Sequence, residues 1–479
     1  MWTFTKQFEH LFKTQNLSED SRAATIISYN RHIMLERLDR QENTVSPEKQ
    51  TATQRALRFK TPQIDSRVLD WRGVLPTLQM IAGKSPFFQL DEVPIPDPEI
   101  LGSQGVRFYP IVTGVCGSDK KIVHLDMSES ALMDVPNVPP ENSSRFVRAL
   151  RQLMRWNNED GRILRPFTLG HEIVAMNERR ERGVLYPIVS CEFKFDDPSE
   201  YCPHCVQRKQ NLCQRLQEGP TRGLALGTGV ITAEGKELGG GFSSVLVAYE
   251  NQFILLPEGM SNQQAVLTDA YACAVNGVEM VQDYLLENKE SKDILIIGLG
   301  AIGFSVMNRL IQLGIPAERI TALVKNAHQE RIVKHLGGKP LLLNGGKVVA
   351  EAASSVDARR EMLTGKEYVI SGGKGGFDVV FDCVGSRKSI HDSYWLTKPD
   401  GHFVELGLPD KIDDSIGRKQ VQIHFPFWAT VEQYRQALGD LQKIPEQCEG
   451  FVNTNHTLLG AKSAFFPQDR KYIKHAIKI

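Results

Sequence analysis

The sequence predicts an α/β fold with three parts: an N-terminal helical arm, a β-rich domain and a domain with a doubly wound parallel sheet. In the first 55 residues, apolar side chains recur three and four positions apart, as on the buried side of a helix. From residue 56 to residue 256, short β-rich runs alternate with proline and glycine. From residue 292 onward, apolar strands alternate with helical segments, which is the pattern of a parallel sheet.

Composition and charge restrict the class of protein. The 479 residues, 41% of them hydrophobic, are enough for two or three packed domains of ~100–200 residues each. Basic and acidic residues both number 57, so no net charge attracts nucleic acid or an anionic membrane. No apolar run reaches the ~18–20 residues of a membrane helix, and the N-terminus lacks a secretory signal pattern. We therefore expect a cytoplasmic protein that binds small molecules or other protein surfaces, with no nucleic acid and no membrane partner.

Changes in texture along the chain give the expected organisation. Helices are expected at residues 5–13 and 21–38, which either dock a partner or an identical subunit or simply pack on the parent domain. A long insertion at about residues 125–165 contains a further expected helix at 144–156, and loops of this length often act as lids or partner sites. The expected domains are residues 1–55, the helical extension; 56–256, the β-rich domain; 257–421, the nucleotide-binding domain; and 422–479, with a helix at 430–441 and a terminal strand at 472–479.

A glycine-rich turn marks the expected nucleotide site. Residues 293–303 read DILIIGLGAIG, an apolar strand that runs into Gly298, Gly300 and Gly303 and then into a helix-compatible stretch, with Ile302 inside the turn. The first glycine permits a tight turn, the second lets a pyrophosphate approach the backbone, and the third lets helix and strand pack. The helix N-terminus then faces the phosphates. This context favours a dinucleotide-binding Rossmann domain over a simple turn.

The end of the next strand indicates which dinucleotide binds. An acid usually stands there when the adenosine ribose has a free 2′-hydroxyl, as in NAD. Here Lys325 and Asn326 occupy the tip, with His328 and Arg331 close by. A tip without a carboxylate does not repel a 2′-phosphate, and a cation can bind it through charge-assisted hydrogen bonds. We expect NADP, with NAD as the alternative if Lys325 is only a solvated loop residue.

A cluster of cysteines predicts a structural zinc. Five of the eight cysteines fall between residues 116 and 213, which in a reducing compartment indicates metal binding rather than disulfides. Cys202, Cys205 and Cys213, with Cys191 upstream, supply four soft ligands for a closed tetrahedral site. His204 is the competing fourth ligand.

A second group of residues predicts an open metal site. Cys116, Ser118 and Asp119 lie in one short motif, and His171 and Glu172 follow a glycine further along the chain. A cysteine, a histidine and a carboxylate can hold zinc and leave one position for substrate. Each motif alone is commonplace, but their order is informative.

In this order the motifs resemble those of the zinc-containing medium-chain dehydrogenase/reductase family, and the likeness covers about residues 56–479. The resemblance implies a GroES-like catalytic domain wrapped around the Rossmann domain, with residues 422–479 returning to the catalytic domain. Further matching segments are residues 90–98, similar to the opening β-hairpin; 239–243, similar to a sheet-edge turn; and 377–385, Gly401 and Gly407, similar to later Rossmann strands.

The resemblance also assigns ligands to the catalytic zinc. It implies that Cys116 and His171 are ligands and that Glu172 is a ligand that exchanges with substrate or water. Asp119 resembles the carboxylate that orients the histidine ligand, a support that metal sites generally need.

The remaining ligand of this zinc is expected in residues 267–273, which read LTDAYAC. The segment is similar to that of family members that use an aspartate, so we expect Asp269. Cys273 is the rival, because other members use a cysteine in this region.

Three departures from the family pattern are visible. The N-terminal arm and the 125–165 insertion are additions, and the insertion is expected to reshape the substrate mouth. Ser199 stands where close spacing would place the first cysteine of the structural site, so Cys191 is inferred for that role. Lys121 stands where several members have a relay histidine; His124 or water is expected to replace it.

The expected function is a zinc-dependent alcohol dehydrogenase that moves a hydride between a secondary alcohol, polyol or sugar-like carbinol and NAD(P). Zinc as a Lewis acid lowers the pKa of a bound alcohol. Ser118 is the expected first proton carrier, because a hydroxyl both donates and accepts; otherwise it only shapes a turn. Two alternatives are an NADPH-dependent carbonyl reductase and a cofactor-binding regulatory or interaction protein on the same fold. A homo-dimer or homo-tetramer is expected.

Overall fold

The computed structural model divides the chain into two compact units, residues 1–95 with 121–166 and residues 96–120 with 167–479. It describes residues 53–59, 88–124, 167–223, 225–228, 232–233, 236–287, 290–344, 347–348, 376–407, 421–467 and 471–479. The helices expected at 5–13, 21–38 and 144–156 lie outside these residues. Within the described residues, no helix combines the length and apolarity needed to cross a membrane.

The described part of the first unit consists of an antiparallel pair of strands and the last four residues of helix α4 (Gly117–His124). Strand β1 (Thr53–Phe59) pairs antiparallel with β2 (Phe88–Pro94), in a register that places Thr53 opposite Pro94. Gln54 and Ala56 are buried while Thr53 and Arg55 are exposed, the alternation of a strand with one covered face. Strand β2 provides the strand expected at the start of residues 90–98.

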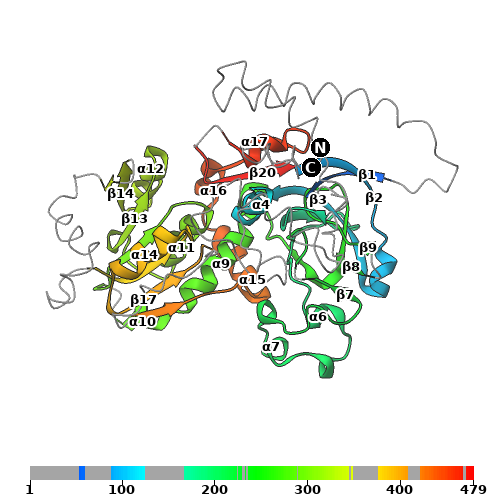
Figure 1. Cartoon of the computed structure of the whole chain (residues 1–479), viewed down its shortest axis with the longest axis horizontal. Helices are drawn as coiled ribbons and strands as arrows, with labels where there is room; N and C mark the ends of the chain where they lie inside the picture. Colours follow the sequence, from blue (N-terminus) through cyan, green and yellow to red (C-terminus); the bar gives the residue numbers. More distant parts are fainter. Residues whose placement is uncertain are drawn as a thin grey trace, which may run out of the picture. The chain divides into compact units, whose positions relative to one another are not determined.

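A mostly antiparallel sheet forms the β-rich part of the second unit. Its strand order is β11-β6-β5-β3-β20-β19, and β10 also pairs with β3. Figure 1 shows the C-terminal strand β20 in red close to β3 in blue, so the chain returns to this sheet at its end. The strands are β3 (Gly105–Gly114), β5 (Glu172–Met176), β6 (Arg182–Leu185), β10 (Leu246–Tyr249), β11 (Phe253–Leu255), β19 (Val452–Thr457) and β20 (Lys474–Lys478).

A second sheet, parallel apart from the β14–β15 pair, has the order β15-β14-β13-β12-β16-β17-β18. The chain leaves the central strand β12 on one side and resumes on its other side with β16, and ligands bind at the carboxyl ends of strands at such a switch point. The strands are β12 (Ile294–Ile297), β13 (Ile320–Val324), β14 (Lys339–Asn344), β15 (Lys347–Val348), β16 (Phe377–Asp382), β17 (Thr397–Glu405) and β18 (Gln422–His424).

The α-helices of the second unit cover both sheets, and one continuous cluster of buried side chains spans them. Helices α11 and α15 both pack on α9. Polar caps begin several helices, as at Ser261, Ser386 and Thr430, whose side chains accept hydrogen bonds from the first turn. The helices are α4 (Gly117–His124), α6 (Cys191–Lys194), α7 (Pro203–Val206), α8 (Asn262–Ala265), α9 (Thr268–Glu279), α10 (Gln282–Glu287), α11 (Ala301–Gln312), α12 (Ala327–His335), α14 (Arg387–Leu396), α15 (Val431–Leu441), α16 (Pro445–Phe451) and α17 (Ala461–Phe465).

Short elements complete the described chain. These are the 3-10 turns η1 (Pro98–Gln104), η3 (Pro198–Glu200), η4 (Gln210–Leu212), η5 (Glu250–Gln252) and η6 (Ala317–Arg319) and the short strands β4 (Phe167–Thr168), β7 (Thr221–Arg222), β8 (Thr232–Ala233) and β9 (Lys236–Glu237).

The alternation of strands and helices expected from residue 292 onward is confirmed by the parallel sheet. In the β-rich part, strand β6 ends at Leu185, because Pro187 cannot donate a ladder hydrogen bond and Cys191 already begins α6. Strand β18 lies beyond residue 421 and still pairs with β17, so the parallel sheet extends past the expected start of the returning segment.

Candidate metal centres and cofactor site

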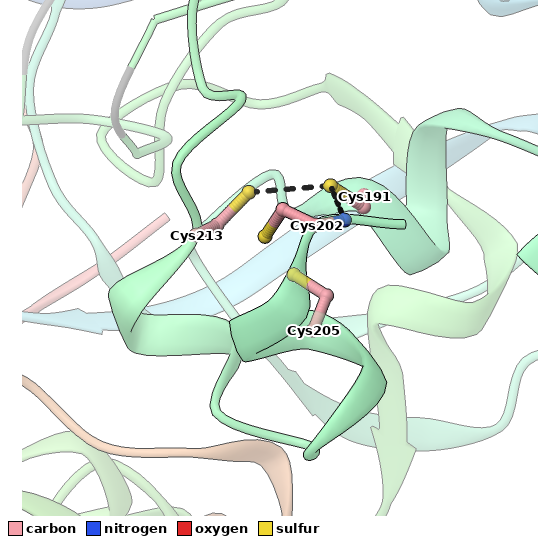
Figure 2. A group of neighbouring side chains, drawn as sticks. All are labelled: Cys191, Cys202, Cys205 and Cys213. Atoms are coloured by element: carbon pink, nitrogen blue, oxygen red, sulfur yellow. Dashed lines mark hydrogen bonds between the residues drawn. The ribbon is translucent and has the colours of Figure 1, made fainter. Parts of the chain in front are cut away.

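Four buried cysteines converge in one lobe of the second unit. Cys191 begins α6, Cys202 caps α7, Cys205 lies inside α7 and Cys213 follows η4. Their sulfur atoms all lie within 4.8 Å of one another, and Figure 2 shows the four side chains turned toward a common point. All four are free thiols, and His204, the alternative ligand, is outside the group. The chemistry and closure of this group fit a structural zinc.

The four thiols differ in how readily they lose a proton, because the pKa is lowered for Cys202 and Cys213 and raised for Cys191 and Cys205. The hydrogen bond from the Cys205 thiol lowers the pKa of Cys213 to about 5. Burial raises the pKa of the neighbouring Cys191 to about 11. Thiols this close to one another titrate together. A metal cation that binds sulfur as thiolate would displace their protons.

A buried lysine that the sequence analysis did not single out binds backbone carbonyls of the segment that follows Cys213. Lys194 is only 7% exposed, and its ammonium donates to the carbonyls of Arg215 and Leu216 at 3.0 Å and of Glu218 at 3.2 Å. Burial lowers the pKa of Lys194, although the negative charges of Cys213 and Cys191 act in the opposite direction and raise it. It therefore fixes the segment that follows Cys213. In the sequence, the one indication of this role is that Lys194 follows Cys191 by three positions.

The second expected group forms where adjacent strands end. Cys116 lies between β3 and α4, and His171 and Glu172 stand at the start of β5, which pairs with β3. One ligand atom of each lies within 4.8 Å of the other two. Gly170, with a φ of 97°, turns the chain before His171 and accepts a 2.7 Å hydrogen bond from the Gly241 N–H in the expected sheet-edge turn.

Asp119 organises this group. The carboxylate is fully buried; one oxygen lies 3.5 Å from His171 Nδ1 and the other accepts from the Cys116 N–H at 2.9 Å. Burial disfavours the imidazolium, but Asp119 and Cys116 outweigh it and raise the pKa of His171. His171 Nε2 lies 3.5 Å from Ser118 Oγ. Asp119 thus restrains the imidazole ring of His171 from its Nδ1 side, as expected for a metal-bound histidine.

Glu172 supplies a test of fit for a metal ion. Its side chain is 2% exposed, and Oε1 has no hydrogen-bond donor among the described residues. Burial raises the pKa of Glu172, an effect that the charge of Lys474 opposes. A buried carboxylate oxygen without a donor, beside a thiol and an imidazole, fits a divalent cation.

The structure places the expected third ligand differently. Asp269 lies in the first turn of α9, outside the group of three, and accepts a hydrogen bond from the Tyr434 hydroxyl. Cys273, one turn later, is also outside the group, and burial raises its pKa. Glu172, which was also expected as a ligand, joins Cys116 and His171 in this group, while Asp269 and Cys273 lie outside it.

Three neighbouring side chains were missed by sequence reasoning. Lys474 of β20 is 4% exposed and forms an ion pair with Glu172. Tyr434 of α15 holds Asp269. The centre of the Trp428 ring lies 6.5 Å from the centre of the His171 ring, and the backbone of Trp428 has a φ of 49°. Of these three, only Lys474 could have been found from the sequence. It lies two positions before the apolar Ala476, and residues two apart in a strand share one face.

The glycine turn has the form of a nucleotide-phosphate cradle. Gly298 adopts a φ of 87°, and a Cβ at Gly303 would overlap the Gly298 carbonyl. A Cβ at Gly300 would meet no atom within 4 Å, and α11 begins at the next residue. Half-buried Ile302 lies in the first turn of α11. The loop therefore leaves room for phosphate at a helix N-terminus.

The tip of β13 is polar and free of carboxylates. The Lys325 side chain is exposed, while the backbone N–H of Lys325 donates to the side-chain oxygen of Gln329. The side-chain amide of Gln329 donates in turn to the Leu299 carbonyl in the glycine turn. Asn326 caps α12, since its side chain accepts from two backbone N–H groups of the first turn. Arg331 lies along a cavity of about 630 Å³ between α12 and α16.

Comparisons with known proteins agree with this geometry. Residues 301–443 match the family model described as zinc-binding dehydrogenase. D-arabitol-phosphate dehydrogenase from Enterococcus avium is 26% identical over 247 residues, which are 51% of this chain and 60% of that protein. A zinc-binding dehydrogenase from Sinorhizobium meliloti 1021, solved with NADP, has a TM-score of 0.57 at 18% identity, covering 89% of this chain and all of that one.

A further solved structure, an alcohol dehydrogenase from Escherichia coli CFT073 with NADH, has a TM-score of 0.54 at 17% identity and covers 89% of this chain and all of that one. These likenesses show the fold, a GroES-like part joined to a Rossmann part. Together with the order of the cysteine, histidine and glycine motifs, the matches show that this chain is similar to proteins of the zinc-containing medium-chain dehydrogenase/reductase family.

Proposed function

We propose that this chain is a zinc-dependent dehydrogenase that transfers a hydride between the carbinol carbon of a secondary alcohol, polyol or sugar-like substrate and NADP(H). The observation that carries the proposal is the group of Cys116, His171 and Glu172 in the same unit as the glycine turn. An open metal site and a dinucleotide cradle in one unit are the two parts that this reaction requires.

In this proposal Cys116 and His171 hold the catalytic zinc and Glu172 is its exchangeable ligand. Asp269 remains a candidate ligand that would first have to leave Tyr434. When bound, zinc acts as a Lewis acid that lowers the pKa of the substrate hydroxyl. Cys191, Cys202, Cys205 and Cys213 would hold the structural zinc.

Proton movement is assigned to Ser118. Its hydroxyl lies 3.5 Å from His171 Nε2, so it borders the group and can pass a proton between substrate and solvent. The onward carrier expected from the sequence is His124 or water, and the side chain of His124 lies outside the described residues. The role of Ser118 is supported by this proximity and by the family pattern.

The substrate class rests on chemistry and on the relatives. A site with a carboxylate ligand and polar surroundings suits a polyhydroxylated substrate better than a long alkyl alcohol. The relative from Enterococcus avium is named for a polyol phosphate, which supports this class. For the cofactor, the polar tip at Lys325 supports NADP over NAD.

Two further properties are proposed. The edge strand β18 is followed by Phe425 and Phe427, each 44% exposed, which supports burial of this edge between identical subunits in a dimer or tetramer. Eight free thiols support a reducing compartment, the cytoplasm.

The test combines metal analysis with a substrate screen. We expect two zinc ions per chain and reduction of NADP by polyols or sugar alcohols, followed at the nicotinamide absorbance. Cys116→Ala should lose one zinc and nearly all turnover while keeping the other zinc. Cofactor binding without any open zinc or turnover would instead favour an interaction protein, and full activity of zinc-depleted Cys116→Ala would refute the metal assignment.

A further inference from the structure

Three adjacent strands bring a carboxylate and an ammonium together behind the open metal site. Glu172 begins β5 and stands opposite Gly114 at the end of β3. On the other side of β3, Gly114 stands opposite Ala476 of β20, and Lys474 lies two residues before it on the same strand face. The side chains of Glu172 and Lys474 therefore meet across the middle strand.

The residue between them has to be a glycine. A Cβ on Gly114 would overlap the Glu172 carboxylate and press on the Lys474 side chain at 2.9 Å from Cε. The backbone φ of Gly114 is not left-handed, so the requirement comes from space alone. The missing side chain at Gly114 in the middle strand therefore leaves the space that this ion pair fills.

Lys474 and the open metal site compete for the same carboxylate. Glu172 has an oxygen within 4.8 Å of ligand atoms of Cys116 and His171, and its Oε2 forms the ion pair with Lys474. Both side chains are almost fully buried, so neither can turn to water for an alternative partner.

We propose that Lys474 is a positioning residue that holds Glu172 partly withdrawn from the catalytic metal, so that a coordination position stays available to substrate. The inference rests on the proposed function of the site. Two effects act in the same direction: the ammonium binds the carboxylate, and its positive charge repels a divalent cation nearby. Removing Lys474 therefore strengthens metal binding and weakens turnover.

The experiment compares metal retention with turnover in Lys474→Met. Zinc loss to a chelator is followed in the full-length protein, and cobalt is substituted into the open site so that its visible absorption reports the ligands. We expect the catalytic metal to leave about tenfold more slowly than in wild type, with a changed cobalt spectrum and a lower kcat. Lys474→Arg should restore wild-type retention, because a guanidinium can hold the same carboxylate.

Two controls separate positioning from lost stability. Lys194→Met removes another buried ammonium, at the cysteine lobe, and should lower the melting temperature without changing the retention of the catalytic metal. In the double variant Lys474→Met with Glu172→Gln, the gain in retention should disappear, because no carboxylate remains to ligate.

The outcomes also separate this inference from the proposed function. If wild type binds two zinc ions and turns over, but Lys474→Met retains its catalytic metal no longer than wild type, the positioning role is overturned. If wild type binds no metal at Cys116 and His171, the proposed function fails first. A longer retention that persists in the double variant also overturns the role of Glu172.

Discussion

We expect the buried ion pair between Arg309 and Asp440 to stabilise the second unit. Arg309 lies in α11, the helix that follows the glycine turn, and Asp440 lies in α15, which also carries Tyr434. The two charged atoms are 3.0 Å apart, and the side chains are 11% and 1% exposed. The pair therefore joins the helix of the cofactor cradle to a helix that lines the metal site.

A second ion pair of the same length provides the comparison. Arg179 and Glu250 are also 3.0 Å apart, but their side chains are 73% and 61% exposed. Breaking a buried pair costs about 3–5 kcal/mol, because the remaining charge stays buried without its partner. An exposed pair contributes about 0–1 kcal/mol, since water replaces the lost partner.

Arg309→Met should therefore lower the free energy of unfolding by about 3 kcal/mol, at the lower end of that range. Asp440 keeps hydrogen bonds from Gln436 at 2.9 Å and Lys443 at 3.2 Å, which limits the loss. Arg179→Met should change it by less than about 1 kcal/mol. Both are measured by urea unfolding, with tryptophan fluorescence as the signal.

The double variant Arg309→Met with Asp440→Asn tests the cause. Removing both charges should recover part of the stability lost in Arg309→Met, because the carboxylate of Asp440 is then no longer buried without its arginine, with only the exposed Lys443 as ionic partner. If Arg309→Met and Arg179→Met destabilise equally, burial does not decide the strength of these pairs and the reasoning is refuted.

Three further predictions concern metal, cofactor and pH. Cys205→Ser should remove one zinc per chain and lower the free energy of unfolding by about 4 kcal/mol or more, while the catalytic zinc stays; unchanged zinc content would refute the structural site. Lys325→Asp should erase or reverse an NADP preference of roughly tenfold, measured by titration of both cofactors, and a retained preference would show that Lys325 does not select the phosphate. Burial lowers the pKa of His402 and of His424, whose ring nitrogens lie 2.9 Å apart with Lys292 nearby. Because the unfolded chain then takes up protons first, their stabilisation is complete above pH 6.5 and is lost as the pH falls through the lowered values. His402→Gln should flatten this decline in urea unfolding between about pH 6.5 and 5, and an unchanged slope would contradict the assignment.

Elements fixed by local chemistry were predictable from the sequence. The strand and helix around Gly298 follow from an apolar run, a turn that only glycines permit and a helix-forming stretch, all within a few residues. The cysteine lobe is similar, because residues 191–213 are close along the chain and their spacing limits how far apart the thiols can lie. In both cases the information is contained in neighbouring residues.

The parts that were missed depend on strands and helices that are distant in sequence. Glu172 meets Lys474 only because β5, β3 and β20 become neighbours in one sheet. Asp269 meets Tyr434 only because α15 packs on α9. No local pattern contains these pairings, since they depend on how long-range contacts are satisfied together.

The sequence by itself determined the residue types and the local frames of the site: the glycine turn, the four clustered cysteines, and Cys116 and His171 beside short strands. The tertiary structure decided which partner restrains each carboxylate, Lys474 for Glu172 and Tyr434 for Asp269. The physical reason is that a buried charge must find its partner within a few ångströms, and only the packing of distant segments determines what lies within that distance.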